Sequence, residues 1–203
     1  MSALNDLSKD TVIFISGTPC TGKTTVATNL NDYLSENGFN SKLIKINDFA
    51  FENDLVLGED PEKFYKVIDI DKLNECLNDE IKSFKSSLKG NGEISVLIVE
   101  GHLSHLCEGA DKMIVLRLNP STLKERLEER NYSESKIQEN LEAEALAVCS
   151  AEAYAIYGEE ANEIDASHKS IEEIRDLILE IASDNFESPV GSIDFMEWLL
   201  NQS

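Results

Sequence analysis

The sequence predicts an α/β fold of three layers (α/β/α), in which helices cover both faces of a parallel sheet. Two observations favour this fold. Strand-like and helix-like segments alternate along the chain, as expected when helices connect parallel strands. Residues 94–99 form a continuous apolar run, which is typical of a central strand buried on both faces. The 203 residues suffice for one core, so we expect residues 1–203 to form one domain.

The first half of the chain opens with a strand and a helix. Residues 11–16 are a short β-rich run, and residues 24–36 predict a helix that ends at an Asn-Gly pair. Residues 41–46 predict a second strand. Residues 47–69 are irregular, acidic and aromatic, so we expect a helical excursion there rather than sheet. Residues 71–89 predict another helix, which a Gly-Asn-Gly sequence ends.

The middle of the chain continues the alternation. The buried strand at residues 94–99 is followed by a strand at residues 113–118, which we expect to be its neighbour in the sheet. Asn119 and Pro120 supply a cap and a first-turn proline for a helix that reaches Arg130.

Two longer helices and an edge strand are predicted in the last third. Residues 133–157 predict one long helix, and residues 161–166 a weak edge strand. A capping-box pattern begins a helix at residues 170–183. A short tail helix is expected at residues 193–200.

The chain is strongly acidic, with 39 acidic and 18 basic residues and a formal net charge of −21. Such a field repels nucleic-acid phosphates and anionic membranes but attracts a basic protein, so we expect no direct nucleic-acid binding. The four cysteines lack the spacing of a metal site and the density of a disulfide scaffold. No apolar stretch has membrane-spanning length and no leader-like start is present. We expect a soluble, cytoplasmic protein with reduced cysteines and no membrane contact.

A phosphate-binding motif follows the first predicted strand. Residues 17–24 read Gly-Thr-Pro-Cys-Thr-Gly-Lys-Thr and match G-x-x-x-x-G-K-[ST] at every fixed position. The strand before the match and the helix after it give this loop the context it requires, whereas an ordinary glycine-rich turn needs neither. We expect the backbone N–H groups of this loop to surround the phosphates of ATP. Cys20 and Gly22 are among the expected ATP-binding residues. We expect Lys23 to reach the β- and γ-phosphates and Thr25 to contact the α-phosphate.

A magnesium site is predicted beside this loop. The Thr24 hydroxyl is a ligand for Mg²⁺, and Glu100, at the end of the strand beside the loop's own strand, is expected to hold the ion through water. His102 follows, and it either orients water or phosphate or makes a structural hydrogen bond. A transition-metal site of Glu100, His102 and His105 is the disfavoured alternative.

Two arginines lie one helical turn apart in the predicted helix. Arg126 and Arg130 are four residues apart and share one face of the predicted helix. They either clamp a transferring phosphoryl group or belong to an ion-paired surface helix, since three glutamates surround them. Spacing alone favours the surface helix.

Together these segments resemble the adenylate kinase isoenzyme 6 family, also called the coilin-interacting nuclear ATPase family, and its archaeal relatives. The resemblance covers nearly the whole chain, with matching segments at residues 15–25, 99–102, 125–133 and 140–144. The Glu-Gly-His sequence at residues 100–102 and the tail at residues 193–200 are more similar to the archaeal branch. The resemblance implies a P-loop NTPase fold like that of nucleoside monophosphate kinases, with a short lid.

The resemblance also implies roles for individual residues. It implies a mobile lid at residues 129–139, with Arg130 on the nucleotide phosphates, and it places Lys169 near the adenine. It implies an acceptor-binding region at residues 45–68, which contains Asp48 as an acceptor contact. His102 matches the histidine of an Asp-x-His motif linked to ATPase activity, which favours the water-positioning alternative.

The sequence departs from the family pattern at two positions. Cys20 stands where the family usually has glycine, so a side chain must fit where the backbone turns tightly. Phe51 stands where some members carry an acceptor-side arginine, which bears on affinity for the monophosphate.

The resemblance and the motif together imply an enzyme that converts ATP and AMP to two ADP with Mg²⁺, has intrinsic ATPase activity, and uses Lys23, His102 and Arg130 as catalytic residues. The resemblance further implies work in small ribosomal subunit maturation, through a platform ribosomal protein whose basic charge suits the acidic chain. The alternative is an ATP-switched ribosome assembly factor with little AMP kinase activity. A signalling GTPase is disfavoured because no Asn-Lys-x-Asp motif is present.

Overall fold

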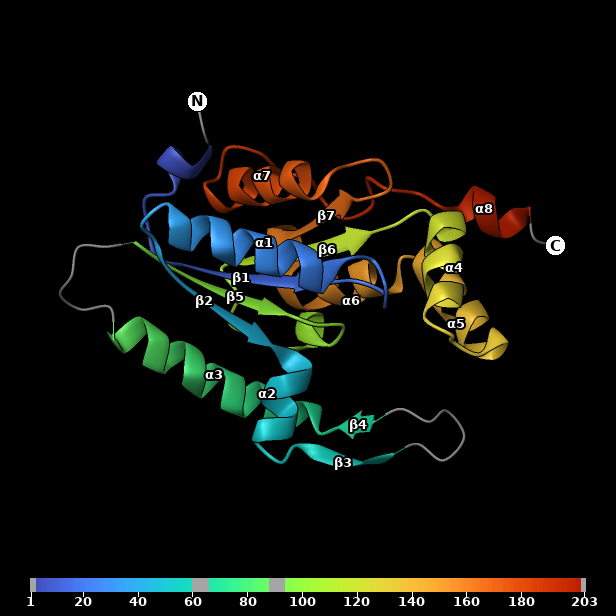
Figure 1. Ribbon diagram of the computed structural model, residues 1–203, viewed down its shortest axis with the longest axis horizontal. Helices are drawn as coiled ribbons and strands as arrows, with labels where there is room; N and C mark the ends of the chain where they lie inside the picture. The colour runs from blue at the N-terminus through green and yellow to red at the C-terminus, as the bar shows by residue number, and fades with distance from the viewer. Residues whose placement is uncertain (1–2, 60–65, 88–93, 202–203) are drawn as a thin grey trace.

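A five-stranded parallel sheet forms the centre of the computed structural model, which describes residues 3–59, 66–87 and 94–201 (Figure 1). All neighbouring strands of this sheet run parallel. In spatial order the strands are β2 (Asn40–Lys45), β5 (Ser95–Glu100), β1 (Thr11–Ser16), β6 (Lys112–Arg117) and β7 (Ala161–Asp165).

Helices cover both faces of the sheet, because successive strand residues point to opposite sides. In β1, Ile13 and Ile15 face a core shared with α1 (Lys23–Glu36) and α7 (Ile171–Ala182). Val12 and Phe14 face a second core shared with α3 (Ile70–Ser87) and α6 (Val148–Tyr157). The predicted three-layer architecture is therefore confirmed.

The remaining helices lie at the carboxyl edge of the sheet or beside it. Figure 1 shows α4, α5 and α8 together beyond the end of β6. They are α4 (Pro120–Glu129), α5 (Glu134–Ala145) and α8 (Met196–Leu200), and single 3₁₀ turns occur at η1 (Ala3–Asp6), η2 (Ser104–Leu106) and η3 (Gly158–Glu160). No helix of the described part of the chain is long and apolar enough to cross a membrane.

Local signals place several boundaries as predicted. The Asn119 side chain accepts a hydrogen bond from the Ser121 N–H at 3.0 Å, and Pro120 occupies the first turn of α4. Ser170 and Glu173 form the predicted capping box at the start of α7. The five predicted strands begin and end within one residue of their expected positions.

The prediction that the strand at residues 113–118 pairs with the strand at residues 94–99 was wrong. β1 lies between β5 and β6, so the strand at residues 113–118 pairs with β1 instead. Apolar runs show burial but not strand order, and both β5 and β6 are buried.

The region at residues 47–69 contains sheet, contrary to the expectation of helix alone. After α2 (Ile46–Glu52), β3 (Val56–Glu59) and β4 (Lys66–Ile68) pair antiparallel, separately from the main sheet. Strands of four and three residues contain too few alternations to show a strand period. The part of this prediction at residues 60–65 lies outside the described residues, as do residues 88–89 of the predicted helix.

The long helix expected at residues 133–157 is two helices. The chain turns at Ala147, where φ is +54°, and α6 begins at the next residue. No glycine or proline marks this break, so the sequence gives no sign of it. The tail helix is also shorter than predicted, because Ile193 donates its N–H to Glu163 Oε1 at 2.7 Å instead of beginning a helix.

Candidate functional site

The phosphate-loop motif connects β1 to α1 at the carboxyl edge of the sheet. Gly17 has φ +136°, and a Cβ there would lie 2.3 Å from the Leu116 carbonyl oxygen, so only glycine fits. Cys20 has φ +70°, in the left-handed region that favours glycine. The cysteine therefore adopts the glycine-like backbone anticipated at this position, at a conformational cost of about 1–3 kcal/mol.

Lys23 folds back over the loop. Its Nζ donates hydrogen bonds to the carbonyl oxygens of Gly17 and Thr18, at 2.9 and 2.8 Å. Burial lowers its pKa to about 8, while the charges of Glu100 and Glu144 act in the opposite direction. The ammonium group thus lies at the loop, held by neutral carbonyls that an anionic phosphate is able to replace.

Thr24 and Glu100 meet beside the loop, as the sequence predicts for a metal site. The Thr24 hydroxyl donates to Glu100 Oε1 at 3.1 Å, since β5 pairs with β1 and brings Glu100 to the first turn of α1. Desolvation raises the pKa of Glu100, and its hydrogen bond with Thr24 opposes that shift. A hydroxyl and a carboxylate oxygen suit Mg²⁺ by their chemistry. The part of the chain that the structure describes contains no group of three or more histidine, cysteine or acidic side chains that could hold a metal.

His102 lies against the same loop. Its Nδ1 is 3.1 Å from the Gly17 carbonyl oxygen and 3.9 Å from Cys149 Sγ. Desolvation lowers the pKa of His102, and the Lys23 charge adds to this effect, so the neutral ring is favoured near pH 7. His105 is instead buried, with Ser16 Oγ 2.7 Å from its Nδ1 and Glu152 Oε2 2.9 Å from its Nε2.

The two arginines of α4 differ in position. Arg126 Nη1 donates to the Cys20 carbonyl oxygen at 3.3 Å and so reaches the phosphate loop. Arg130 is exposed at the C-terminal end of α4. The ion pair found on this helix joins Lys124 and Glu128 rather than either arginine. Arg126 is thus a contact of the phosphate loop that the sequence did not single out, because spacing alone could not separate it from a surface residue.

Comparison with known proteins places the chain in a family. Residues 13–147 match the family described as "AAA domain". A protein of Methanothermobacter thermautotrophicus is 40% identical over 189 residues, which cover 93% of this chain and 99% of its own. One of Methanococcus maripaludis is 38% identical over 187 residues, which cover 92% and 96%. The chain belongs to the family of these archaeal proteins. Both carry the name "Putative adenylate kinase".

A solved structure supports the fold that this archaeal family shares. An uncharacterized protein from Eubacterium ventriosum aligns with 87% of this chain and 99% of its own, with a TM-score of 0.50 and 14% sequence identity. At that identity the likeness concerns the fold alone. With the parallel sheet and the loop before α1, it confirms the predicted three-layer P-loop NTPase fold.

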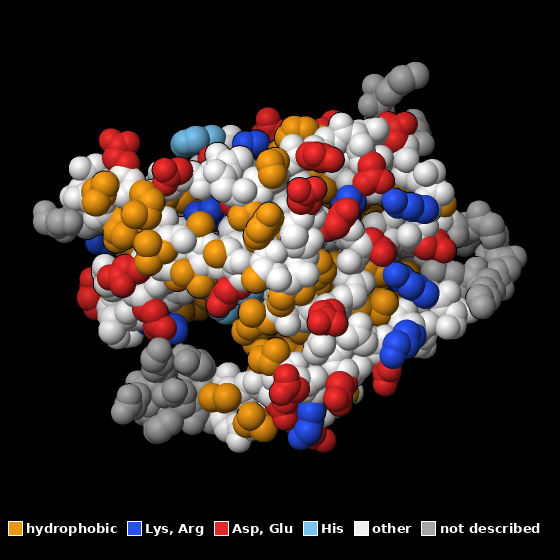
Figure 2. Space-filling model, turned by 180° about the vertical axis from the view of Figure 1, so that it is seen from behind, with side chains coloured by type: hydrophobic (Ala, Val, Ile, Leu, Met, Phe, Trp, Pro, Cys, Tyr) orange, Lys and Arg blue, Asp and Glu red, His pale blue; other side chains and the backbone are white. Residues whose placement is uncertain are grey.

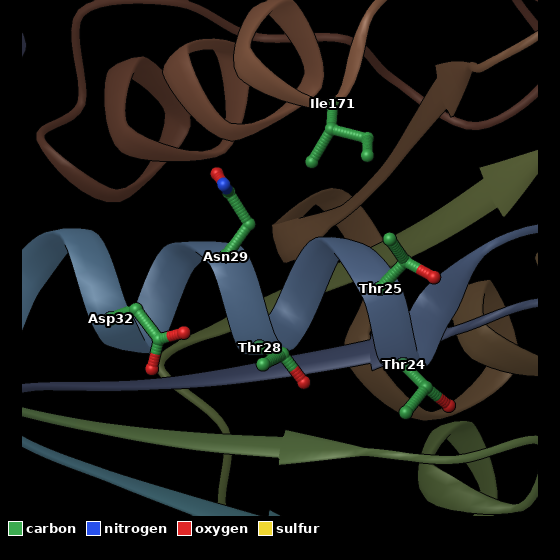
Figure 3. A pocket seen from close by; sticks show the side chains of 6 residues that line it. All are labelled: Thr24, Thr25, Thr28, Asn29, Asp32 and Ile171. Carbon is green, nitrogen blue, oxygen red and sulfur yellow. The ribbon is translucent and has the colours of Figure 1, made fainter.

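The other predicted site residues are Thr25, Lys169 and Asp48. Thr25, in the first turn of α1, shares a shallow depression of about 380 Å³ with Thr24, and Ile171 of α7 lines its other side (Figure 3). Lys169 is exposed in the loop between β7 and α7. Asp48 is exposed in the first turn of α2, where its charge raises the pKa of Glu100. The remaining lining residues of the depression are Thr28, Asn29 and Asp32.

The lowered pKa of Lys23 predicts a pH dependence for ATP capture. Because the charged ammonium attracts the phosphates, kcat/KM for ATP should fall as the pH rises through about 8, although lysine ordinarily titrates near 10.5. Bound phosphate stabilises the ammonium, so kcat should fall only at higher pH. Rates measured from about pH 6 to pH 10 test this split. A kcat/KM that stays constant above pH 8 would contradict it.

Proposed function

We propose that this chain is a nucleoside monophosphate kinase that transfers the γ-phosphoryl group of ATP to AMP, yielding two ADP, and that it also hydrolyses ATP slowly. The observation that carries the proposal is the convergence of Lys23, Thr24 and Glu100 on one phosphate loop. The names of the archaeal relatives favour the same activity. The resemblance to the isoenzyme 6 family favours the added ATPase activity.

Catalysis in this proposal is positioning and charge neutralisation. Lys23 leaves the carbonyls of Gly17 and Thr18 and binds the β- and γ-phosphates, while backbone N–H groups of the loop hold the phosphate oxygens. Arg130, on the lid at residues 129–139, moves over the transferring group and stabilises its developing charge. Mg²⁺ held by Thr24 and Glu100 supplies further neutralisation of the phosphates when bound.

In this proposal the acceptor nucleotide binds over residues 45–68, of which the structure describes 45–59 and 66–68. From behind, the surface is hollowed between the body of the molecule and the arm that carries β3 and β4 (Figure 2). Phe51 of α2 stands where some members of the resembled family carry an acceptor-side arginine, and Lys66 Nζ lies 4.6 Å from the centre of its ring. Lys66 thus supplies a positive charge near that position, which suits an anionic acceptor.

A second candidate function is the ATP-switched ribosome assembly factor. The net charge of −21 favours a basic partner such as a small-subunit platform ribosomal protein. Figure 2 shows acidic side chains spread across one face rather than gathered at one spot. Such a distribution supports long-range attraction more than a defined docking site.

The rate of ADP formation with and without AMP tests the proposed function. A kinase should form ADP from ATP and AMP far faster than it hydrolyses ATP alone. The assembly factor should show a similar slow rate in both cases. If AMP did not accelerate ADP formation, the AMP kinase function would be excluded and the ribosome assembly factor would be favoured.

His102 should separate hydrolysis from transfer. His102→Gly removes the ring beside the loop, and a residue that orients water matters to hydrolysis but much less to transfer onto a bound hydroxyl or phosphate acceptor. We expect ATPase activity to fall about tenfold or more and AMP kinase activity to change less. Steady-state assays of both reactions on one protein preparation measure this, and equal losses would exclude the water-positioning role.

A further inference from the structure

A buried ionic network lies behind the phosphate loop. Arg117, at the end of β6, donates from Nε to Glu144 Oε1 at 2.9 Å and from Nη1 to Glu163 Oε2 at 3.0 Å. The side chains of Arg117 and Glu144 are 1% exposed and that of Glu163 is fully buried. A buried charge left without partners is strongly destabilising, so the positions of these groups are tightly fixed.

One end of the network reaches the phosphate loop. The Thr18 hydroxyl donates a short hydrogen bond to Glu144 Oε2. The carbonyl oxygen of the same residue accepts hydrogen bonds from Lys23 Nζ at 2.8 Å and from Thr21 Oγ1 at 2.9 Å. Thr18 therefore joins a fixed carboxylate on one side to the Lys23 ammonium group on the other.

Glu144 is held from the opposite side as well. Its Oε1 accepts from the Leu118 N–H at 2.9 Å, and its own carbonyl oxygen accepts from Arg117 Nη2 at 2.7 Å. It lies in the last turn of α5, just before the chain turns at Ala147. The C-terminal end of α5, a helix whose first half belongs to the proposed lid, is thereby fixed to β6 of the sheet.

The far end of the network does not touch the loop. Glu163 accepts from Ser150 Oγ at 2.9 Å and from the N–H groups of Gly191 and Ile193 at 3.0 and 2.7 Å. Ser150 and Thr18 thus make the same kind of bond, a buried hydroxyl to a buried carboxylate, at opposite ends of one network. This symmetry offers a matched control.

We propose that Glu144 is a positioning residue that acts through Thr18 to hold the phosphate loop in the form that binds a nucleoside triphosphate. The inference deepens the proposed function and rests on it for the identity of the ligand. A loop already ordered by this bond loses less conformational freedom when phosphate binds, so its affinity is higher. Residues 140–144 match the resembled family but contain none of the proposed catalytic residues. The proposal gives this segment a role.

Thr18→Val tests the bond, because valine keeps the shape of threonine and removes the hydroxyl donor. We expect the Kd for ATP to rise about tenfold, which corresponds to the loss of one hydrogen bond to a charged group. Thr18→Ser restores a hydroxyl and should bring the Kd back near that of the wild-type protein. Isothermal titration calorimetry with ATP measures binding directly, without turnover.

Ser150→Ala is the control for a loss of stability alone. It should lower the melting temperature about as much as Thr18→Val while leaving the Kd for ATP unchanged, since its bond to Glu163 is remote from the loop. A double-mutant cycle with Glu144→Gln assigns the effect, because Thr18→Val should add little to a protein that already lacks the Glu144 charge.

Three results would overturn the proposal. They are wild-type affinity in Thr18→Val, an equal loss of affinity in Ser150→Ala, and full additivity with Glu144→Gln. Failure of the proposed function gives a different result, since AMP would then not accelerate ADP formation by the wild-type protein while its ATP affinity still responds to Thr18→Val.

Discussion

Lys23→Ala should lower kcat/KM for phosphoryl transfer by about a thousandfold or more. The ammonium group is the positive charge nearest the loop, where its two acceptors are backbone carbonyls that phosphate oxygens replace. Its loss removes both attraction for the terminal phosphates and stabilisation of charge in the transition state. ATP hydrolysis should fall with transfer, because both reactions move the same γ-phosphoryl group. Coupled assays of ADP formation measure both rates.

The control for this prediction is Lys82→Ala. Lys82 lies on α3 in an exposed ion pair with Asp79, and exposed pairs of this kind contribute little to stability. This variant should keep both activities, although it changes the net charge by the same amount. A folded Lys23→Ala protein with near-normal rates would contradict the assignment of the phosphate loop.

Arg130→Ala should lower both the kinase and the ATPase rate by about a hundredfold or more, as expected for an arginine that neutralises a transferring phosphoryl group. Arg126, four residues earlier on the same helix, contacts the Cys20 carbonyl oxygen, so this side of α4 lies near the phosphate loop. The exposed Arg130 is then one helical turn away from that contact. Single-turnover measurements at saturating ATP separate this effect from a loss of binding.

Lys124→Ala is the matched control on α4. Lys124 is half-exposed and its Nζ lies 3.9 Å from Glu128 Oε1, in an i,i+4 pair on the surface. Its removal should leave both rates within about twofold of the wild type. If Arg130→Ala behaved like Lys124→Ala, the lid would have no catalytic arginine at this position.

The layers of the fold follow from local sequence, whereas the order of the strands does not. Continuous apolar runs predicted β5 and β6, and a capping box predicted the start of α7. β1 lies between β5 and β6 because of the way the crossover helices pack. The apolar pattern of the sequence carries no information about that packing. The break at Ala147 is hidden for a related reason, since alanine ordinarily favours helix.

The sequence predicted the part of the candidate site that lies in one continuous motif. The motif predicted Lys23 and Thr24, and the strand end predicted Glu100, which the structure brings to 3.1 Å from the Thr24 hydroxyl. The spacing of Arg126 and Arg130 left a phosphoryl clamp open, but the contact of Arg126 with the loop depends on the packing of α4. The hydrogen bond that Thr18 donates to Glu144 spans 126 positions of sequence, so only the folded structure reveals it.

The proposed AMP kinase must bind ATP and AMP at the same time, with the phosphates of both at the phosphate loop. A crystal structure with a bisubstrate dinucleotide inhibitor, in which phosphates link two adenosines, tests it most directly. We expect the phosphates at Lys23, one adenosine near Lys169 and the other over residues 45–68 near Asp48. An inhibitor with only one adenosine bound, and the other in solvent away from residues 45–68, would contradict the claim.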